Sequence, residues 1–185
     1  FVAAGADAIN LSQGGFYDYA WQYFTMCPVE ADGPAPNLDL VAQVKKVVPV
    51  PVIAAAHITP EIGEQAIRQG KLDFVAMGRA LQCDPDLPNK LARGREKDIR
   101  PCIHCNHCIE TLPWAEGVVC VVNPALGMEK EFEIKKAAKP KKVIIVGGGP
   151  AGMEAARVAT LRGHQVTLYE KERKLGGQLI LAGIP

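Results

Sequence analysis

The sequence lacks an excess of charge of either sign. Its 185 residues carry 21 Lys and Arg against 20 Asp and Glu, a formal net charge of +1. A balance this even gives no electrostatic basis for binding nucleic acid or an anionic membrane surface. The one basic cluster, at 135–142, is short and broken by Ala and Pro, so we interpret it as a solvated linker rather than a nucleic-acid patch. We therefore expect a small-molecule substrate and no nucleic-acid partner.

Long apolar runs are also missing. No stretch approaches the roughly 18–20 apolar residues that a membrane-spanning helix requires, so we predict no membrane association. The first residues show no basic-then-apolar export pattern. We therefore expect a reducing, cytoplasmic location, where clustered cysteines are more often metal ligands than disulfides.

The chain ends do not look like natural domain boundaries. The sequence begins with FVAAGA, which is typical of a helix end, and stops at LAGIP, just after a glycine. We expect a fragment of a longer protein, with room for one domain or parts of two.

The first 100 residues alternate strand-like and helical stretches. Continuous apolar runs predict strands at 8–11, 51–56 and 72–77. Apolar spacing and capping residues predict helices at 38–48, 60–70 and 85–93. Because such strands alternate with helices across short connections, we expect an α/β fold with a parallel sheet covered on both faces. A barrel and an open doubly wound sheet both fit this order.

A second α/β unit begins at Lys142, where a strand, a glycine-rich turn, a helix and a second strand follow one another. Gly147, Gly149 and Gly152 form G-x-G-x-x-G between strand and helix. In this pattern the first glycine allows the tight turn, the second lets the backbone approach a pyrophosphate, and the third lets helix and strand pack closely. Glu170 ends the second strand, where it can accept hydrogen bonds from a ribose. We predict a dinucleotide site, with a plain structural turn as the alternative.

The segment KERKLGGQL after this acid extends the pattern. The unit resembles the FAD- or ADP-binding half of flavoproteins with two dinucleotide-binding domains. The resemblance implies that Gly176, Gly177, Gln178 and Leu179 lie against the nucleotide, although a plain turn is the alternative. Glu170 favours a nucleotide with a free 2′-OH, which means FAD or ADP rather than NADP.

Four cysteines, Cys102, Cys105, Cys108 and Cys120, fall within RPCIHCNHCIETLPWAEGVVCVVNP. Structural zinc sites usually present two separated pairs of ligands, whereas three of these cysteines share one C-x2-C-x2-C run. The triplet suits three corners of a 4Fe–4S cluster, with Cys120 as the fourth ligand. Zinc is the alternative, and a disulfide network fits least well.

Two histidines and two further cysteines are also possible ligands by residue type, but we do not assign them to the cluster. Because four cysteines already suffice, we interpret His104 and His107 as neighbours of the cluster. We interpret Cys27 and Cys83 as isolated buried or loop thiols.

Three features in this order carry a resemblance: GRALQCDPDLPNK, the RPCIHCNHC run with the following CVVNP, and the GGGPAG unit. The chain resembles the iron–sulfur branch of the Old Yellow Enzyme family, which includes 2,4-dienoyl-CoA reductase, trimethylamine dehydrogenase and enoate reductase. The family fold implies four parts. These are the C-terminal β/α units of an FMN-binding TIM (β/α)8 barrel at 1–100, a 4Fe–4S segment at 101–124, a linker at 125–141, and the start of a Rossmann-like FAD/ADP domain at 142–185.

On that map, the three predicted strands are barrel strands six to eight, and the loops after the last two bind the FMN phosphate. The resemblance implies that Arg79 contacts the phosphate, helped by the backbone N–H groups of Met77 and Gly78; a surface ion pair is the alternative for Arg79. Relatives often carry Gly or Asn followed by Arg after strand seven, but this chain has Ala56 and His57. His57 can offer its backbone N–H and, when protonated, a charge.

The long segment at 12–36 follows the first strand and is rich in aromatic residues. In a TIM barrel it would lie on the active-site face, so Tyr17, Tyr19 and Trp21 either line the substrate pocket or pack the loop itself. No catalytic residue is assigned, because in related enzymes the proton donor usually comes from earlier strands.

The resemblance implies that electrons pass from NAD(P)H through FAD and the 4Fe–4S cluster to FMN, which reduces an activated C=C bond. One alternative is an amine dehydrogenase that binds ADP in place of FAD and passes electrons outward to a partner flavoprotein. A second alternative, from another class, is a non-catalytic, zinc-stapled nucleotide-binding module. A homo-oligomer is a further expectation.

Overall fold

The computed structural model describes residues 1–12, 27–110 and 117–183. The chain divides into two compact units, Phe1–Met128 and Glu129–Pro185. The division falls inside the segment that the sequence marks as a linker. Within the described ranges, no helix is both long and apolar enough to cross a membrane.

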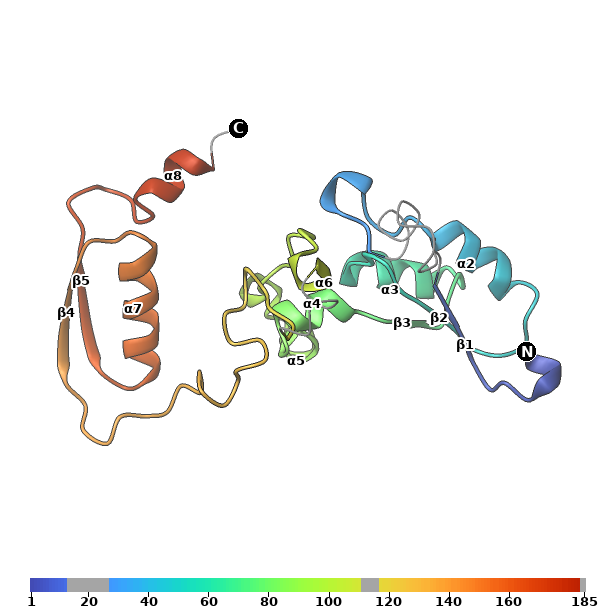
Figure 1. Cartoon of the computed structure of the whole chain (residues 1–185), viewed down its shortest axis with the longest axis horizontal. Helices are drawn as coiled ribbons and strands as arrows, with labels where there is room; N and C mark the ends of the chain where they lie inside the picture. The colour runs from blue at the N-terminus through green and yellow to red at the C-terminus, as the bar shows by residue number, and fades with distance from the viewer. Residues whose placement is uncertain (13–26, 111–116, 184–185) are drawn as a thin grey trace. The chain divides into compact units, whose positions relative to one another are not determined.

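The first unit contains a three-stranded parallel sheet in the order β1-β2-β3. The strands are β1 (Ile9–Leu11), β2 (Val52–Ala54) and β3 (Phe74–Val75). The helices α2 (Leu38–Lys45) and α3 (Pro60–Arg68) connect them and pack against the strands (Figure 1). The predicted alternation of helices with parallel strands is therefore confirmed.

The core of this unit lies between the sheet and these two helices. Val52 and Ala54 of β2 are fully buried, and Val41 of α2 and Ala66 of α3 pack with them. Gly63 lets α3 approach β3, because a Cβ there would lie 2.8 Å from a methyl carbon of Val75. This close packing fixes the ends of β2 and β3, where the candidate site begins.

Local chemistry explains where α3 begins and where α2 ends. The Thr59 hydroxyl caps α3 by accepting a hydrogen bond from the Ile62 N–H (3.3 Å), and Pro60 occupies the first helical position. The helix predicted for 38–48 stops at Lys45, three residues early. Pro49 explains this end, since it disfavours a helical Val48 and has no N–H for the Lys45 carbonyl.

Three short helices follow β3 and carry the chain into the cysteine segment: α4 (Gly78–Cys83), α5 (Leu87–Ala92) and α6 (His107–Glu110). The sequence predicted α5 but neither α4 nor α6. Single turns of 3-10 helix lie at η1 (Val2–Ala4), η3 (Glu30–Asp32) and η4 (Glu96–Asp98).

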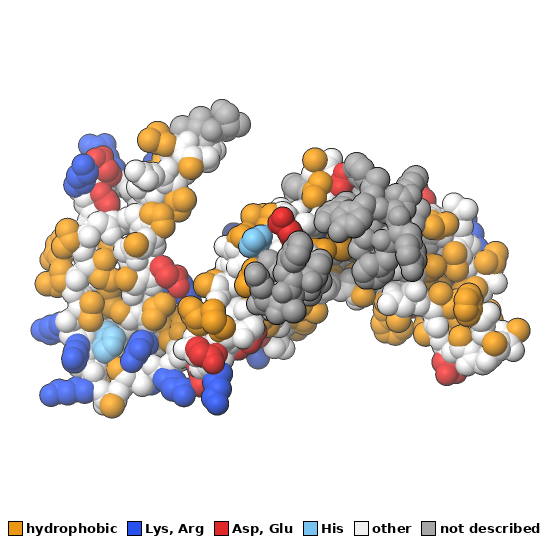
Figure 2. All heavy atoms as spheres, in the orientation of Figure 1, with side chains coloured by type: hydrophobic (Ala, Val, Ile, Leu, Met, Phe, Trp, Pro, Cys, Tyr) orange, Lys and Arg blue, Asp and Glu red, His pale blue; other side chains and the backbone are white. Residues whose placement is uncertain are grey.

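The second unit pairs two parallel strands, β4 (Lys142–Val146) and β5 (Gln165–Tyr169). Helix α7 (Pro150–Leu161) connects them and lies along one face of the pair, and α8 (Gln178–Ala182) follows (Figure 1). On the strands, exposed residues alternate with half-buried ones, and Ile144 and Val146 are 69% and 84% exposed. Figure 2 shows hydrophobic side chains gathered on the strand side of this unit.

The polar stretch before β4 contains turns but no strand or helix within its described residues. This backbone agrees with the linker that the sequence analysis expects. It is fastened to the second unit by the Ala137 N–H, which donates to the carbonyl of Arg162 (2.8 Å).

Candidate functional site

A cavity of about 230 Å³ opens where β2 and β3 end. We call it the strand-end cavity. It is lined by all five residues that the sequence assigned to FMN binding: Ala56, His57, Met77, Gly78 and Arg79. The fold therefore brings together residues that lie more than twenty positions apart in the chain.

The backbone around this cavity is strained on one side and open on the other. Ala56 and His57 have φ angles of 79° and 51°, in the left-handed region that non-glycine residues rarely adopt. Such residues cost about 1–3 kcal/mol each and cluster at ligand sites. Gly78 needs no positive φ, and a Cβ there would meet nothing within 4 Å. A glycine at this position keeps space open in the cavity wall, which suits a bound group.

Arg79 connects the strand-end cavity to the cysteine segment. Its Nη1 donates to the carbonyl of Pro28 (2.8 Å) and to the side-chain oxygen of Asn106. Asn106 is buried, has a φ of 60°, and donates through Nδ2 to the carbonyl of Cys27 (2.6 Å). The guanidinium carries three further N–H donors on Nε and Nη2. Arg79 can therefore hold the cysteine segment and face an anion at the same time.

A second cavity, which we call the thiol cavity, is lined by the four predicted ligand cysteines and by Arg79 and Gln82. The ligand cysteines are Cys102, Cys105, Cys108 and Cys120. Among the residues that the structure describes, no three His, Cys, Asp or Glu side chains are grouped to hold a single metal ion. The four thiols therefore share the wall of one cavity.

Cys83 is a buried thiol, as predicted, but it is not isolated. Its side chain lines the thiol cavity, is 1% exposed, and lies 3.5 Å from Cys120, Sγ to Sγ. Burial and the neighbouring Cys120 and Cys102 raise the pKa of Cys83. The chain therefore places five cysteines around one cavity, and the fifth comes from α4.

Backbone N–H groups point at the sulfur atoms. The His104 N–H donates to the Cys102 Sγ at 3.4 Å. Burial raises the pKa of Cys120, but the N–H groups of Val122 and Asn123 outweigh this effect and lower it. Hydrogen bonds to a sulfur stabilise its thiolate form, which is the form that binds metal.

Polar side chains fasten both ends of the cysteine segment to α4. Asn123, 4% exposed, donates through Nδ2 to the Gln82 carbonyl (2.8 Å) and accepts from Arg100 Nη1 (3.0 Å). The Arg100 N–H donates to Asp84 Oδ2 (2.8 Å), directly after α4. These bonds hold Cys102 and Cys120 near each other although 18 positions separate them.

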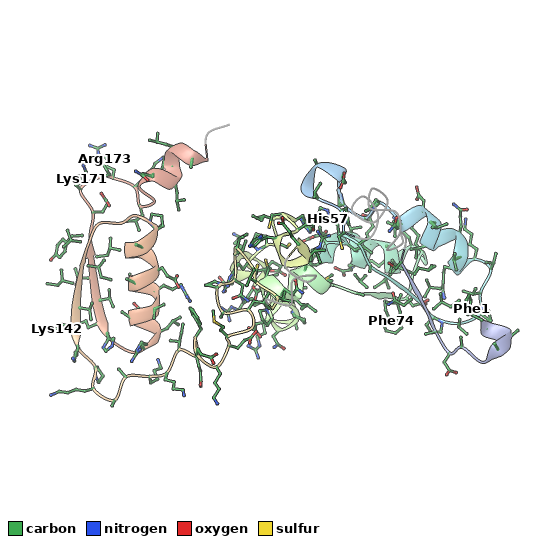
Figure 3. All side chains as sticks on the ribbon, in the orientation of Figure 1. Phe1, His57, Phe74, Lys142, Lys171 and Arg173 are labelled. Atoms are coloured by element: carbon green, nitrogen blue, oxygen red, sulfur yellow. The ribbon has the colours of Figure 1, made fainter. Side chains whose placement is uncertain are left out.

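The two histidines of the segment differ in their surroundings. His104 lies against His57 with ring centroids 3.4 Å apart and the planes tilted by 33°. His57, labelled in Figure 3, belongs to the strand-end cavity, so this pair is a second contact between that cavity and the cysteine segment. His107 lies 3.7 Å from a carboxylate oxygen of Glu110 in α6.

In the second unit, a different structural property accounts for glycine at each of the three motif positions. Gly147 has a φ of 101°. A Cβ on Gly152 would lie 1.9 Å from the Gly147 carbonyl oxygen. Gly149, which caps α7, needs neither a positive φ nor close packing, because a Cβ there would meet nothing within 4 Å. The space beside Gly149 is what a closely approaching pyrophosphate would require.

Glu170 lies beside this glycine loop. Its Oε2 accepts from the Gly148 N–H (2.5 Å) and its Oε1 from the Glu172 N–H (2.9 Å). These N–H groups, Glu172 first, lower the pKa of Glu170. A carboxylate has about four acceptor positions, so it can still accept from ribose hydroxyls. The sequence alone does not predict the contact between Glu170 and Gly148.

The predicted Gly-Gly-Gln-Leu segment packs on the same loop. The Gly176 N–H donates to the Gly148 carbonyl (2.8 Å), and a Cβ on Gly177 would lie 3.3 Å from the Gly149 Cα. Gln178 and Leu179 begin α8. The segment therefore contacts the glycine loop directly through its backbone. That it lies against a nucleotide stays a prediction. Tyr17, Tyr19 and Trp21 lie outside the described residues.

Comparison with known proteins finds oxidoreductases as relatives of this chain. Residues 142–185 match the family model described as FAD dependent oxidoreductase. A cinnamate reductase from Clostridium sporogenes is 45% identical over 186 residues, which cover 100% of this chain and 27% of the relative.

Two solved structures are similar in sequence and fold. A 2-naphthoyl-CoA reductase is 34% identical with a TM-score of 0.82, over 94% of this chain and 26% of its own. A histamine dehydrogenase from Rhizobium sp. 4-9 is 31% identical with a TM-score of 0.78, over 96% of this chain and 26% of its own.

The chain belongs to the iron–sulfur branch of the Old Yellow Enzyme family. It spans about a quarter of the length of the family members it matches. The α/β fold with parallel strands agrees with these flavin oxidoreductases.

Proposed function

We propose that this chain is part of an oxidoreductase in which electrons pass from NAD(P)H through FAD and a 4Fe–4S cluster to FMN, which reduces an activated C=C bond. The substrate class is an enoyl or dienoyl thioester, an enoate or an unsaturated ketone. The net reaction adds the hydride of NAD(P)H and one proton across the double bond. The observation that carries the proposal is Arg79, which lines both the strand-end cavity and the thiol cavity.

The strand-end cavity fits the phosphate of FMN. It lies at the C-terminal ends of two parallel strands, the usual phosphate position in TIM barrels. Arg79 provides a permanent positive charge, and Gly78 leaves room for backbone N–H groups to approach the ligand. In this proposal β1 to β3 are strands six to eight of the barrel.

The thiol cavity fits a 4Fe–4S cluster better than zinc. A zinc ion needs four ligand atoms about 2.0–2.3 Å away, whereas a cubane spreads its four thiolates around a larger body. The four cysteines line one apolar space, and three of them come from a single C-x2-C-x2-C run that suits three corners of a cubane. The N–H groups aimed at Cys102 and Cys120 stabilise the thiolates.

The second unit fits the ADP part of FAD. Gly149 leaves the space for the pyrophosphate, and Glu170 is ionised beside the loop, ready to accept ribose hydroxyls. The match of residues 142–185 to the FAD-dependent family model supports this assignment.

The second candidate is an amine dehydrogenase, favoured by the similarity to histamine dehydrogenase. In that version the same cysteines would pass electrons outward to a partner flavoprotein, and the second unit would bind ADP. The similarity to cinnamate reductase over the whole chain, and the higher TM-score with 2-naphthoyl-CoA reductase, favour C=C reduction.

The full-length enzyme tests the proposal. Purified without oxygen, it should contain FMN, FAD, and iron and acid-labile sulfide in equal amounts. It should oxidise NAD(P)H only when an unsaturated thioester, enoate or ketone is added. Reduction of a dye by amines, with ADP bound in place of FAD, would select the amine dehydrogenase. Zinc without flavin would contradict both and leave a nucleotide-binding module.

A further inference from the structure

Of the cysteines that line the thiol cavity among the described residues, Cys83 is the one to which the proposed function gives no role. It is the last residue of α4, is 1% exposed, and lines the same space as the four predicted ligands. Its Sγ is 3.5 Å from the Sγ of Cys120. A sulfur contact of this length falls within hydrogen-bond distance when one of the two atoms carries a proton.

The chemistry of the ligand decides which sulfur donates. A cysteine that binds metal must give up its proton, so Cys120 can only accept once a cluster is held. The remaining proton in the pair is then on Cys83. The thiol is buried in an apolar wall, which disfavours its ionisation and excludes water as a competing partner.

We propose that the Cys83 thiol donates an S–H···S hydrogen bond to the Cys120 thiolate and thereby raises the reduction potential of the cluster. A donor to a ligand sulfur withdraws negative charge from the cluster, which favours the reduced form because that form carries one more electron. Cys83 is thus a positioning residue that sets how readily the cluster accepts an electron.

The position of α4 makes this donor a fixed part of the site. Asn123, three residues after Cys120, donates to the carbonyl of Gln82, the residue before Cys83. This bond holds the two cysteines at one separation. In a six-residue helix that begins at Gly78, Arg79, Gln82 and Cys83 lie on one face, and all three line the thiol cavity.

The inference rests on the proposed cluster, and its test keeps the two claims apart. The midpoint potential of the cluster would be measured by EPR-monitored redox titration of the full-length enzyme and three variants, Cys83→Ala, Cys83→Ser and Cys27→Ala. We expect a lower potential for Cys83→Ala. We expect a potential near that of the wild type for Cys83→Ser, since its hydroxyl can still donate. Cys27 does not line the thiol cavity, so Cys27→Ala should leave the potential unchanged.

A second measurement detects the proton of the Cys83 thiol directly. ENDOR spectra of the reduced cluster, recorded in H2O and D2O, should show an exchangeable proton coupling that is lost in Cys83→Ala. An unchanged potential in Cys83→Ala, or equal shifts in both Cys83 variants, would overturn the donor role. Loss of iron from both variants would make Cys83 a ligand and overturn it too. Absence of iron from the wild type would instead contradict the proposed function, and the inference with it.

Discussion

At the scale of single residues, neighbouring positions with the same amino acid serve different purposes. Gly149 and Gly152 stand three residues apart in one loop. A side chain on Gly152 would collide with the Gly147 carbonyl, whereas a side chain on Gly149 would enter open space. The fold therefore requires glycine at position 152, whereas the proposed ligand requires it at position 149.

The substitutions Gly149→Ala and Gly152→Ala should therefore separate stability from binding. We expect Gly152→Ala to destabilise the second unit by about 1–3 kcal/mol, as overpacking does. Gly149→Ala should change stability by no more than about 0.5 kcal/mol yet weaken FAD or ADP binding tenfold or more, about 1.4 kcal/mol. Urea unfolding and nucleotide titration of the full-length enzyme check both. Tight nucleotide binding by Gly149→Ala would contradict the proposed use of that space.

Arg79 provides the other prediction at this scale. Arg79→Lys keeps the charge but replaces a planar fork by a single ammonium, which cannot hold Pro28, Asn106 and a phosphate together. We expect reduced FMN content and an altered cluster EPR spectrum. Arg68→Lys is the matched control, because Arg68 is exposed on α3 and pairs only with Glu64 among its described ion pairs. Full FMN content in Arg79→Lys would show that the phosphate is held elsewhere.

At the scale of elements, the sequence predicted what local patterns determine. The parallel strands, α3 with its Thr59 cap, and the glycine turn before α7 each have a signal within a few residues. Helix α4 has none, because six residues starting Gly-Arg show no apolar periodicity. The approach of Cys83 to Cys120 spans 37 positions and depends on packing. The helical spacing of Arg79, Gln82 and Cys83 would have indicated a shared face, had α4 been recognised.

Asp84 joins the elements around the thiol cavity, and its removal should loosen them. Its side chain is 3% exposed and accepts from Lys90 Nζ (2.6 Å) and the Arg100 N–H (2.8 Å). Burial raises the pKa of Asp84, but these two donors outweigh it, so the pKa is lowered. We expect Asp84→Ala to cost about 1–3 kcal/mol, because it leaves the half-buried Lys90 ammonium and the Arg100 N–H without their carboxylate partner. Urea unfolding at neutral pH measures this loss.

The lowered pKa also fixes the direction of the pH dependence. The carboxylate stabilises the fold fully above its unfolded pKa, about 3.9, and this contribution is lost as the pH falls through the lower folded value. Stability of the wild type should therefore decline in that acid range more than stability of Asp84→Asn, which carries no charge to lose. If the free energy of unfolding falls equally with decreasing pH in the two proteins, Asp84 does not cause this decline.

At the scale of the whole molecule, both units leave apolar strand residues uncovered. Phe74 of β3, labelled in Figure 3, is 58% exposed, and Ile144 and Val146 of β4 are more exposed still. Parallel sheets are normally covered on both faces. The family members that this chain matches are about four times its length, so they have further chain with which to cover such faces.

The 185 residues on their own should therefore behave differently from the full-length enzyme. Three strands do not close a barrel, so we expect the isolated chain to bind a hydrophobic dye and to retain little FMN. The full-length enzyme should bind FMN stoichiometrically and should not increase the fluorescence of the dye. Flavin content and dye fluorescence of both proteins are the measurements. Stoichiometric FMN in the isolated chain would contradict the barrel assignment.

The spacing of the thiols and the Asn123 contact bear on how the enzyme matures. If the proposed cluster is bound, three cysteines within seven residues can capture three of its corners while the chain is still partly open. The fourth corner closes only when Cys120 is brought to α4 by the bond between Asn123 and the Gln82 carbonyl. Insertion would then end with the docking of one loop, and that corner would be the first to lose its iron when the loop detaches.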